Sequence, residues 1–267
     1  MLARDKNRYH SILENVFFGH YNKGMDRFGF DRTELVAACQ RLSIEPPKNL
    51  GDIIYSARYR AGVTPRIEKT AKPHFVWLIM PAGKARYEFV QVEDVPLEPN
   101  PGHAETRVPD ATPGIIALYA LGDEQALLAR IRYNRLLDVF TGVTCYSLQN
   151  HLRTTVPAYG QIETDELYVG LDRYGVHYVL PVQAKTKRDR LGVVQLLQDY
   201  AFCEARYPDL VVKPIGAQFL ASGAIAMLEY RLDKGLPRIA HEEHYRLVQP
   251  EELTLDELAE YRKHLTP

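Results

Sequence analysis

The sequence predicts an α/β protein of two domains, and three observations support this fold class. Residues 1–91 contain three segments with helical periodicity followed by two short strand patterns. A proline-rich stretch then separates them from the rest of the chain. Beyond it, the predicted order is helix, strand, strand, helix, strand, with one additional strand, which is typical of a sheet flanked by helices. A chain of 267 residues, 46% of them hydrophobic, is long enough for one or two domains.

Apolar residues at helical spacing predict three helices in the first domain. The first helix spans roughly residues 7–19. The second follows Asp31, which is expected to be its N-cap, with Glu34 three residues later as in a capping box. The third, NLGDIIYSARYRAG, comes after the helix-breaking EPPKN and has Asn49 as its expected cap.

Two short strands, HFVWLIM and ARYEFVQV, flank a Pro-Ala-Gly-Lys turn at the end of this domain. Three helices followed by a hairpin is the order of a winged helix-turn-helix, in which the third helix enters the major groove and the hairpin contacts the DNA backbone. Residues 1–91 hold 15 Lys and Arg against 9 Asp and Glu, while the remainder holds 18 against 25. A basic first third suits a polyanion-binding module, although ordinary charge scatter explains it about equally well.

The third helix and the hairpin carry side chains suited to DNA. Arginine pairs bidentately with guanine and asparagine with adenine, whereas lysines and arginines of the hairpin suit phosphates. The helical residues are expected on the outer face of the helix. The predicted nucleic-acid-binding residues are Lys48, Asn49, Tyr55, Ser56, Arg58, Arg60, Lys84 and Arg86. A solvated helix face in a packing or partner-binding domain is the alternative explanation.

Residues 92–113 contain five prolines and little periodicity, which predicts a linker. The second domain is placed at residues 114–240, with a C-terminal helical tail at 241–267. Within the domain, GIIALYAL suggests a buried strand or a strand–helix junction. One amphipathic helix is expected over 123–142, ended by Gly142, and another ends at Pro208. LVVKPIGAQFL and AIAMLEYRL are expected to be strands.

The hairpin TDELYVGLDRYGVHYVLPVQAKTK gathers polar residues at its open end. With Arg173 and Tyr174 in the turn, Gln183 lies beside Asp165 or Glu166, and Lys185 shares the face of Gln183 because side chains alternate along a strand. Burying such groups without a function is costly. Carboxylate and amide oxygens are ligands that Mg²⁺ prefers, and a lysine can orient water or stabilise charge on a scissile phosphate. The hairpin therefore predicts phosphodiester hydrolysis.

ETDELYVG and HYVLPVQAK, followed by a helix, resemble the core of the PD-(D/E)XK nuclease superfamily. The N-terminal PKNLGDIIYSARYR and its wing resemble the DNA-binding part of restriction-like endonucleases. The resemblance implies a C-terminal restriction-endonuclease-like mixed-sheet core flanked by helices. It implies the catalytic residues Asp165, Glu166, Gln183 and Lys185 and the metal ligands Glu163, Asp165, Glu166 and Gln183. Asp165 and Glu166 remain alternatives for the principal acid, and Glu124 is a weaker candidate for a further one.

Two residues depart from the superfamily pattern. Gln183 stands where the second acid is usual, and an amide oxygen can bind a metal but brings no charge. Pro181 lies inside the second strand, where it cannot donate a ladder hydrogen bond, so an edge or bulged strand is expected there. The substitution at Gln183 supports an alternative, a non-catalytic DNA-binding regulator with an inactivated nuclease-like dimerisation domain.

The resemblance also implies cofactor and partners. We expect Mg²⁺, with Mn²⁺ as a substitute, and double-stranded DNA as substrate, in restriction or defence. Lys187 and Arg188 are expected to contact phosphate. Cutting two strands suggests a homodimer, because a two-fold axis matches duplex symmetry, and a cognate DNA methyltransferase is a candidate partner. An RNA or branched-DNA nuclease is a third alternative.

Several other classes lack their sequence signature. The sequence contains no apolar run of about 18 residues, so no transmembrane helix is expected, and the N-terminus does not resemble a signal peptide. The three cysteines are far apart, which fits a reducing cytoplasm and argues against a disulfide framework. There is no P-loop, no G-x-G-x-x-G turn and no G-x-S-x-G elbow, and His241 and His244 alone do not predict a zinc site.

Overall fold

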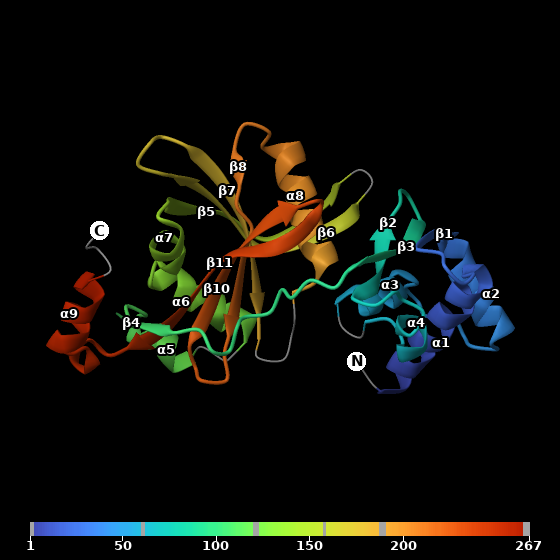
Figure 1. Cartoon of the computed structure of the whole chain (residues 1–267), viewed down its shortest axis with the longest axis horizontal. Helices are drawn as coiled ribbons and strands as arrows, with labels where there is room; N and C mark the ends of the chain where they lie inside the picture. Colours follow the sequence, from blue (N-terminus) through green and yellow to red (C-terminus); the bar gives the residue numbers. More distant parts are fainter. Residues whose placement is uncertain (1–2, 60–61, 120–122, 157–158, 187–190, 264–267) are drawn as a thin grey trace. The chain divides into compact units, whose positions relative to one another are not determined.

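The computed structural model describes residues 3–59, 62–119, 123–156, 159–186 and 191–263. Three predicted DNA contacts, Arg60, Lys187 and Arg188, lie outside these ranges. The described residues form an α/β protein with an eight-stranded mixed sheet and a three-stranded antiparallel sheet (Figure 1). Among the described residues, no helix is both long enough and apolar enough to span a bilayer.

The chain divides into two compact units, each assembled from several segments. The first comprises Met1–Pro96, Arg153–Glu163 and Leu191–Ala205. The second comprises Leu97–Leu152, Thr164–Arg190 and Arg206–Pro267. The two later segments of the first unit come from the stretch that the sequence analysis assigned to the second domain.

The N-terminal part of the first unit contains four helices and three strands among its described residues. The elements are α1 Ala3–His20, β1 Arg27–Asp31, α2 Arg32–Arg41, α3 Gly51–Tyr59, α4 Pro65–Glu68, β2 Phe75–Pro81 and β3 Arg86–Glu93. Their sheet has the order β1-β3-β2 and is antiparallel throughout. The core is aromatic, since the buried Phe17 of α1 contacts the rings of Trp77 and Phe89 at centroid distances of 5.1 and 5.0 Å.

The two helix caps predicted in this unit are confirmed. The Asp31 N–H donates to Glu34 Oε1 at 2.8 Å, as in a capping box. The Gly51 N–H donates to Asn49 Oδ1 at 3.0 Å, so Asn49 satisfies a donor at the start of α3. Neither β1 nor the short α4 was predicted. β1 is a five-residue strand, too short for a clear alternating pattern.

The eight-stranded sheet has the order β4-β11-β10-β9-β7-β6-β5, with β8 paired to β7. Its strands are β4 Glu105–Pro109, β5 Thr144–Val156, β6 Gly160–Leu171, β7 His177–Lys185, β8 Val211–Val212, β9 Ile215–Phe219, β10 Ile225–Asp233 and β11 Leu236–Val248. β6 and β7 are antiparallel, whereas β7 and β9 are parallel. Parallel neighbours need a crossover connection, and the chain between these two strands contains α8, Val193–Arg206.

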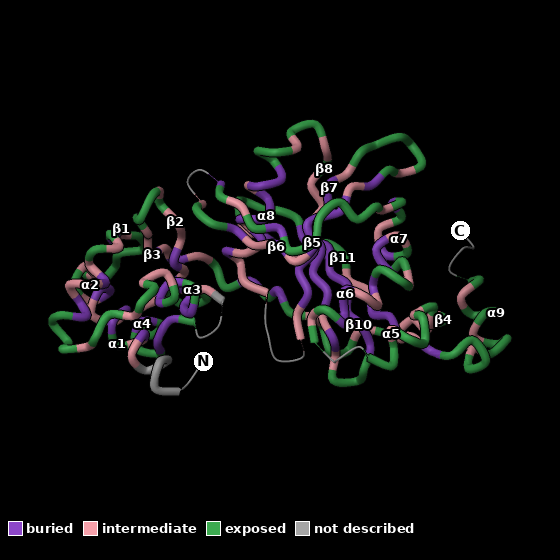
Figure 2. Tube along the Cα trace, turned by 180° about the vertical axis from the view of Figure 1, so that it is seen from behind, coloured by how far each residue is buried: buried purple, intermediate pink, exposed green. Residues whose placement is uncertain are grey.

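The core of the second unit lies between the sheet and the helix α6, Glu124–Tyr133. Leu127, Leu128 and Ile131 of this helix are buried in one cluster with β7 residues that include Leu180 and Val182. Figure 2 shows the buried positions gathered along the central strands of the sheet. The other helices of this unit are α5 Gly114–Tyr119, α7 Leu136–Thr141, the 3₁₀ turn Pro250–Glu252 and α9 Leu255–Lys263.

Two local predictions in the second unit are wrong. The 114–121 segment begins as helix α5 and not as a strand. The single helix expected over 123–142 is broken into α6 and α7 at Arg135, whose φ is 50°. The reason is Asn134, whose side chain donates to the Arg130 carbonyl at 2.9 Å and accepts from the Ala111 N–H at 2.6 Å, and so offers the backbone an alternative to the helix.

Part of the predicted linker is ordered by a partner distant in sequence. Glu105–Pro109 forms β4 and pairs in parallel with the end of β11. The composition of this segment does not predict a strand, so its extended conformation depends on pairing with β11. Residues 241–248, the first part of the predicted helical tail, continue strand β11. The helix expected in the tail begins later, as α9.

Candidate functional site

The β6–β7 hairpin has the register that its sequence predicts. Glu166 pairs with Val182 and Leu171 with His177, so the next position places Asp165 opposite Gln183. The backbone pairing ends at Glu166, and there the Asp165 carboxylate takes part, because its Oδ2 accepts a hydrogen bond from the Ala184 N–H at 2.8 Å. Asp165 therefore lies against β7 between Gln183 and Lys185.

Lys185 contacts a carboxylate from α6. Its Nζ lies 3.8 Å from Glu124 Oε1, and the lysine side chain is 14% exposed. Glu124 occupies the first turn of α6, where the helix dipole favours an anion, and Asp123 caps the helix by accepting from the Ala126 N–H at 2.9 Å. Glu124, which was predicted only as a weaker candidate for a further acid, is thus the residue that contacts the predicted catalytic lysine.

Gln183 is fully buried in β7 and pairs with Gly216 of β9. β7 is not an edge strand of the sheet, because it has β6 on one side and β8 and β9 on the other, and the edge or bulge expected at Pro181 is found only as a local interruption. The proline falls in a gap between those two partners: β8 pairs with Tyr178 and Val179, and β9 begins its pairing at Val182. A residue without an N–H is tolerated where one neighbouring ladder is interrupted.

Glu166 has different surroundings from Asp165. It is buried, and it is bound by the Arg132 Nη2 of α6 and by the Tyr168 hydroxyl, which donates to Glu166 Oε2 at 2.5 Å. Burial raises the pKa of Tyr168 above its usual value, and the adjacent Glu166 carboxylate adds to this effect. Two donors from the protein therefore already satisfy this acid.

The predicted ligands do not form one cluster of acids. Glu163 belongs to the first unit, where Arg153 Nε and Nη2 both donate to its Oε1, at 3.1 and 2.8 Å. Within the described ranges, no three His, Cys, Asp or Glu side chains are arranged to hold a metal ion. The remaining donors near Lys185 are Asp165, Gln183 and Glu124. These are all oxygen donors, which fits the chemistry of Mg²⁺, but they include at most two carboxylates.

The predicted DNA contacts of the first unit have mixed positions. Lys48, Asn49 and Tyr55 are exposed on or before α3, and Lys84 and Arg86 are exposed at the turn between β2 and β3. Ser56 is buried, so its predicted position on the outer face is wrong. Arg58 is partly buried, donates from Nε to the Ile79 carbonyl at 2.6 Å and lies over the Tyr87 ring, so it joins α3 to the hairpin.

Sequence reasoning missed three residues that bind the acids. Arg132 and Tyr168 hold Glu166, and Arg153 holds Glu163. Arg132 has no sequence signal, because a charged residue near the end of an amphipathic helix is common. Arg153 had a usable signal, since it lies about as far from the β5–β6 turn as Glu163 and so faces it across the strands.

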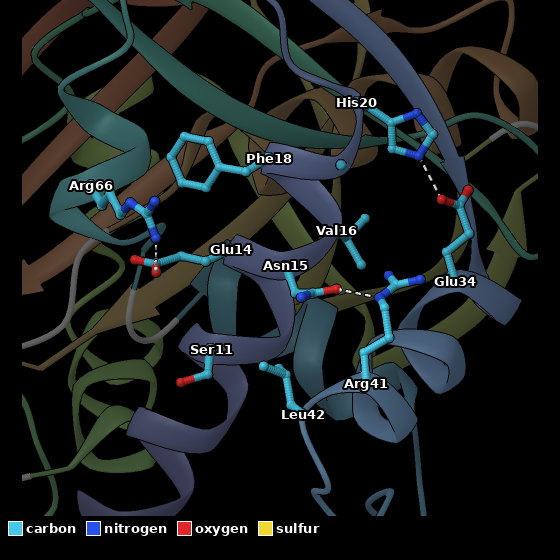
Figure 3. Close-up of a pocket in the computed structure, with 11 residues that line it drawn as sticks. Ser11, Glu14, Asn15, Val16, Phe18, His20, Glu34, Arg41, Leu42 and Arg66 are labelled. Atoms are coloured by element: carbon cyan, nitrogen blue, oxygen red, sulfur yellow. Dashed lines mark hydrogen bonds and ion pairs between the residues drawn. The ribbon is translucent and has the colours of Figure 1, made fainter.

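A hollow of about 670 Å³ lies in the first unit between α1, α2 and α4 (Figure 3). No predicted site residue lines it. Its polar side chains point toward one another, in the pairs His20–Glu34, Asn15–Arg41 and Glu14–Arg66. Burial alone would raise the pKa of Glu34, but hydrogen bonds from the Asp31 N–H and His20 outweigh it and lower that pKa. The pairing indicates a packed surface groove and gives no indication of a ligand.

The open end of the β6–β7 hairpin is therefore the candidate site, where Asp165 contacts β7 at the Ala184 N–H and Lys185 contacts Glu124. Its residues come from two strands and one helix of the second unit. No protein-family model, curated protein or solved structure matches this chain.

Proposed function

We propose that the protein is a metal-dependent endonuclease that hydrolyses double-stranded DNA. One observation carries the proposal: at the open end of the hairpin, the Asp165 carboxylate meets β7 beside Gln183, and the Lys185 ammonium meets Glu124. We infer that these two carboxylates, the Gln183 amide and the Lys185 ammonium act together where the β6–β7 ladder ends. Such a group is costly to desolvate and is the chemistry that phosphodiester hydrolysis needs.

The order of elements around the site supports the same proposal. A helix, α6, precedes three antiparallel neighbours, β5, β6 and β7, and the helix α8 leads to β9, which runs parallel to β7. This is the order expected of a PD-(D/E)XK core, with the acid on the first strand of the hairpin and the lysine on the second. Topology alone does not establish an activity, so the proposal depends on the side chains.

The residues divide the chemistry between them. Asp165 and Glu124 would hold Mg²⁺ with the amide oxygen of Gln183, and the ion supplies charge stabilisation and a more acidic bound water. Lys185 is placed to donate hydrogen bonds to the attacking water or to a phosphate oxygen as charge develops there. Hydrolysis forms a bond from the water oxygen to phosphorus and breaks one bridging P–O bond. The departing oxygen takes up a proton.

The first unit supports a DNA-reading role. Its helices and its β1-β3-β2 sheet follow the order of a winged helix, and exposed lysine, arginine and tyrosine side chains lie on α3 and the β2–β3 turn. We extend the proposal to a restriction or defence setting, with a homodimer on the duplex and a cognate methyltransferase to protect host DNA. Arg60, Lys187 and Arg188 remain predicted contacts.

Incubation of the purified chain with supercoiled plasmid tests the proposal. With Mg²⁺ or Mn²⁺ we expect conversion to linear DNA, and with EDTA we expect none. Methylated and unmethylated plasmids from several sources should be compared, together with structured RNA and branched DNA. Duplex DNA left intact in all of these conditions would contradict the proposal.

The second candidate function is a non-catalytic DNA-binding regulator. A specific observation favours it: Gln183 brings no charge, and Glu166 is already neutralised by Arg132. A site of this kind has fewer anionic ligands than Mg²⁺ usually receives. Sequence-selective binding to DNA without cleavage of that DNA would distinguish this candidate from the nuclease.

Replacing both Lys84 and Arg86 with alanine should weaken the salt dependence of DNA binding. If each residue contacts one phosphate, the negative slope of log K against log salt should become shallower by about 0.9 per residue, or about 1.8 in total. Fluorescence anisotropy with a labelled duplex at several salt concentrations measures this slope. Lys23→Ala, at another exposed lysine of the first unit, is the control and should leave the slope unchanged. An unchanged slope in the double variant would remove the hairpin turn from the DNA interface.

A further inference from the structure

The large sheet has two ends, and they are built differently. β4 and β5 stand at the two ends of the strand order. An edge strand presents unpaired N–H and C=O groups, which can pair with another chain unless the protein prevents it. The devices that prevent such pairing are short length, charge, proline and a covering segment.

β4 has all four of these devices. It is five residues long, contains the charged Glu105 and Arg107 and ends at Pro109. Helix α9 covers it: Arg107 Nη1 donates to Glu257 Oε1 at 2.6 Å, and the Arg107 N–H donates to the Tyr261 hydroxyl at 3.1 Å. This end of the sheet is closed to further strands.

β5 lacks these devices over most of its length. It has 13 residues, and from 144 to 152 its sequence TCYSLQNHL has no Asp, Glu, Lys, Arg, Pro or Gly. Its side chains from 146 to 151 are all exposed, including the apolar Tyr146 and Leu148. Within the described ranges, β6 is the only strand paired with it. The regular extended backbone is interrupted at His151, whose φ is 48°, and β5 continues to Val156.

We propose that β5 pairs with β5 of a second copy of this chain, antiparallel and across a two-fold axis. The Cys145 N–H already donates to Asp138 Oδ1 of α7 at 3.1 Å, so the pairing is centred on Leu148 and places residues 146–150 of one copy against the same residues of the other. A charge at the centre would then oppose its own kind. The absence of charge removes that repulsion. Leu148 then lies opposite Leu148 of the other copy, and Tyr146, two residues away on the same face, packs beside that pair.

This pairing gives the proposed homodimer a defined surface. The joined strands would form one continuous sheet, in which the two copies of β6 are three strand spacings apart, about 14 Å. Each β6 carries Asp165, and the two-fold axis would match that of a DNA duplex. That consequence depends on the proposed nuclease function, but the pairing itself does not.

Size-exclusion chromatography with light scattering of the full chain tests the proposal without DNA. We expect the wild type to have twice the mass of one chain. Leu148→Lys and Leu148→Glu should each raise the dimer dissociation constant by about a hundredfold or more, because like charges then face each other. Mixing the two variants should restore the dimer, because opposite charges meet.

Val211→Lys is the matched control. Val211 is an apolar strand residue of the second unit with the same 49% exposure as Leu148, and the control variant should remain dimeric. Circular dichroism should show all variants folded, since both sites are exposed. A monomeric wild type, a dimeric Leu148→Lys or a mixture that stays monomeric each overturns the proposal. Failed plasmid cleavage by a dimeric protein would instead count against the nuclease function alone.

Discussion

Replacing Lys185 with methionine should reduce DNA cleavage by about a hundredfold or more, because in the proposed mechanism the ammonium stabilises charge that develops only during hydrolysis. Methionine keeps most of the side-chain volume, so the β7 strand and its packing should persist. The expected loss corresponds to about 3 kcal/mol in the barrier. Single-turnover plasmid cleavage, with DNA binding measured in parallel, checks the result. Binding should change far less than the cleavage rate.

Lys213 offers a closely matched control for this experiment. Its side chain is also 14% exposed and paired with a carboxylate, since Nζ lies 2.6 Å from Glu229 Oε2. Lys213→Met therefore removes a similar buried charge from the same unit but away from the hairpin end. We expect this variant to lose stability and to keep its cleavage rate at temperatures where it is folded. Equal loss of cleavage in both variants would mean that the effect of Lys185 is structural.

Asp165→Asn and Glu166→Gln should have opposite effects, which decides between the two acids. The amide introduced by Asp165→Asn retains an oxygen that can accept from the Ala184 N–H, so this variant should keep the fold and lose about a hundredfold in cleavage. Glu166→Gln removes the anion between Arg132 and Tyr168 and should lower the free energy of unfolding by about 1–2 kcal/mol. The partly exposed Arg132 can recover some hydration, which limits that loss.

Chemical denaturation and cleavage assays on both variants give the two readouts. Cleavage by Glu166→Gln should stay within about threefold of the wild type below its unfolding transition. If Glu166→Gln abolishes cleavage and Asp165→Asn does not, Glu166 is the principal acid, and Arg132 must release it when DNA and metal bind. Denaturation midpoints separate that outcome from simple unfolding.

The parts of the fold that local chemistry decides were predictable. Asp31 with Glu34, and Asn49, mark helix starts because a cap is satisfied within a few residues. The Asp172–Gly175 turn fixes the hairpin register, and so the position of Asp165 opposite Gln183. By contrast, Asn134 breaks the expected long helix through contacts with residues 110–112, and such contacts leave no periodic signal.

The sequence by itself determined two helix caps, the hairpin and the register that places Asp165 opposite Gln183, because these depend on neighbours in the chain or across one tight turn. Only the tertiary structure decided which acid is occupied by Arg132, that Glu124 meets Lys185, that Ser56 is buried and that β4 closes one end of the sheet. Those outcomes depend on which distant segments pack together, and side-chain identity alone does not specify that choice.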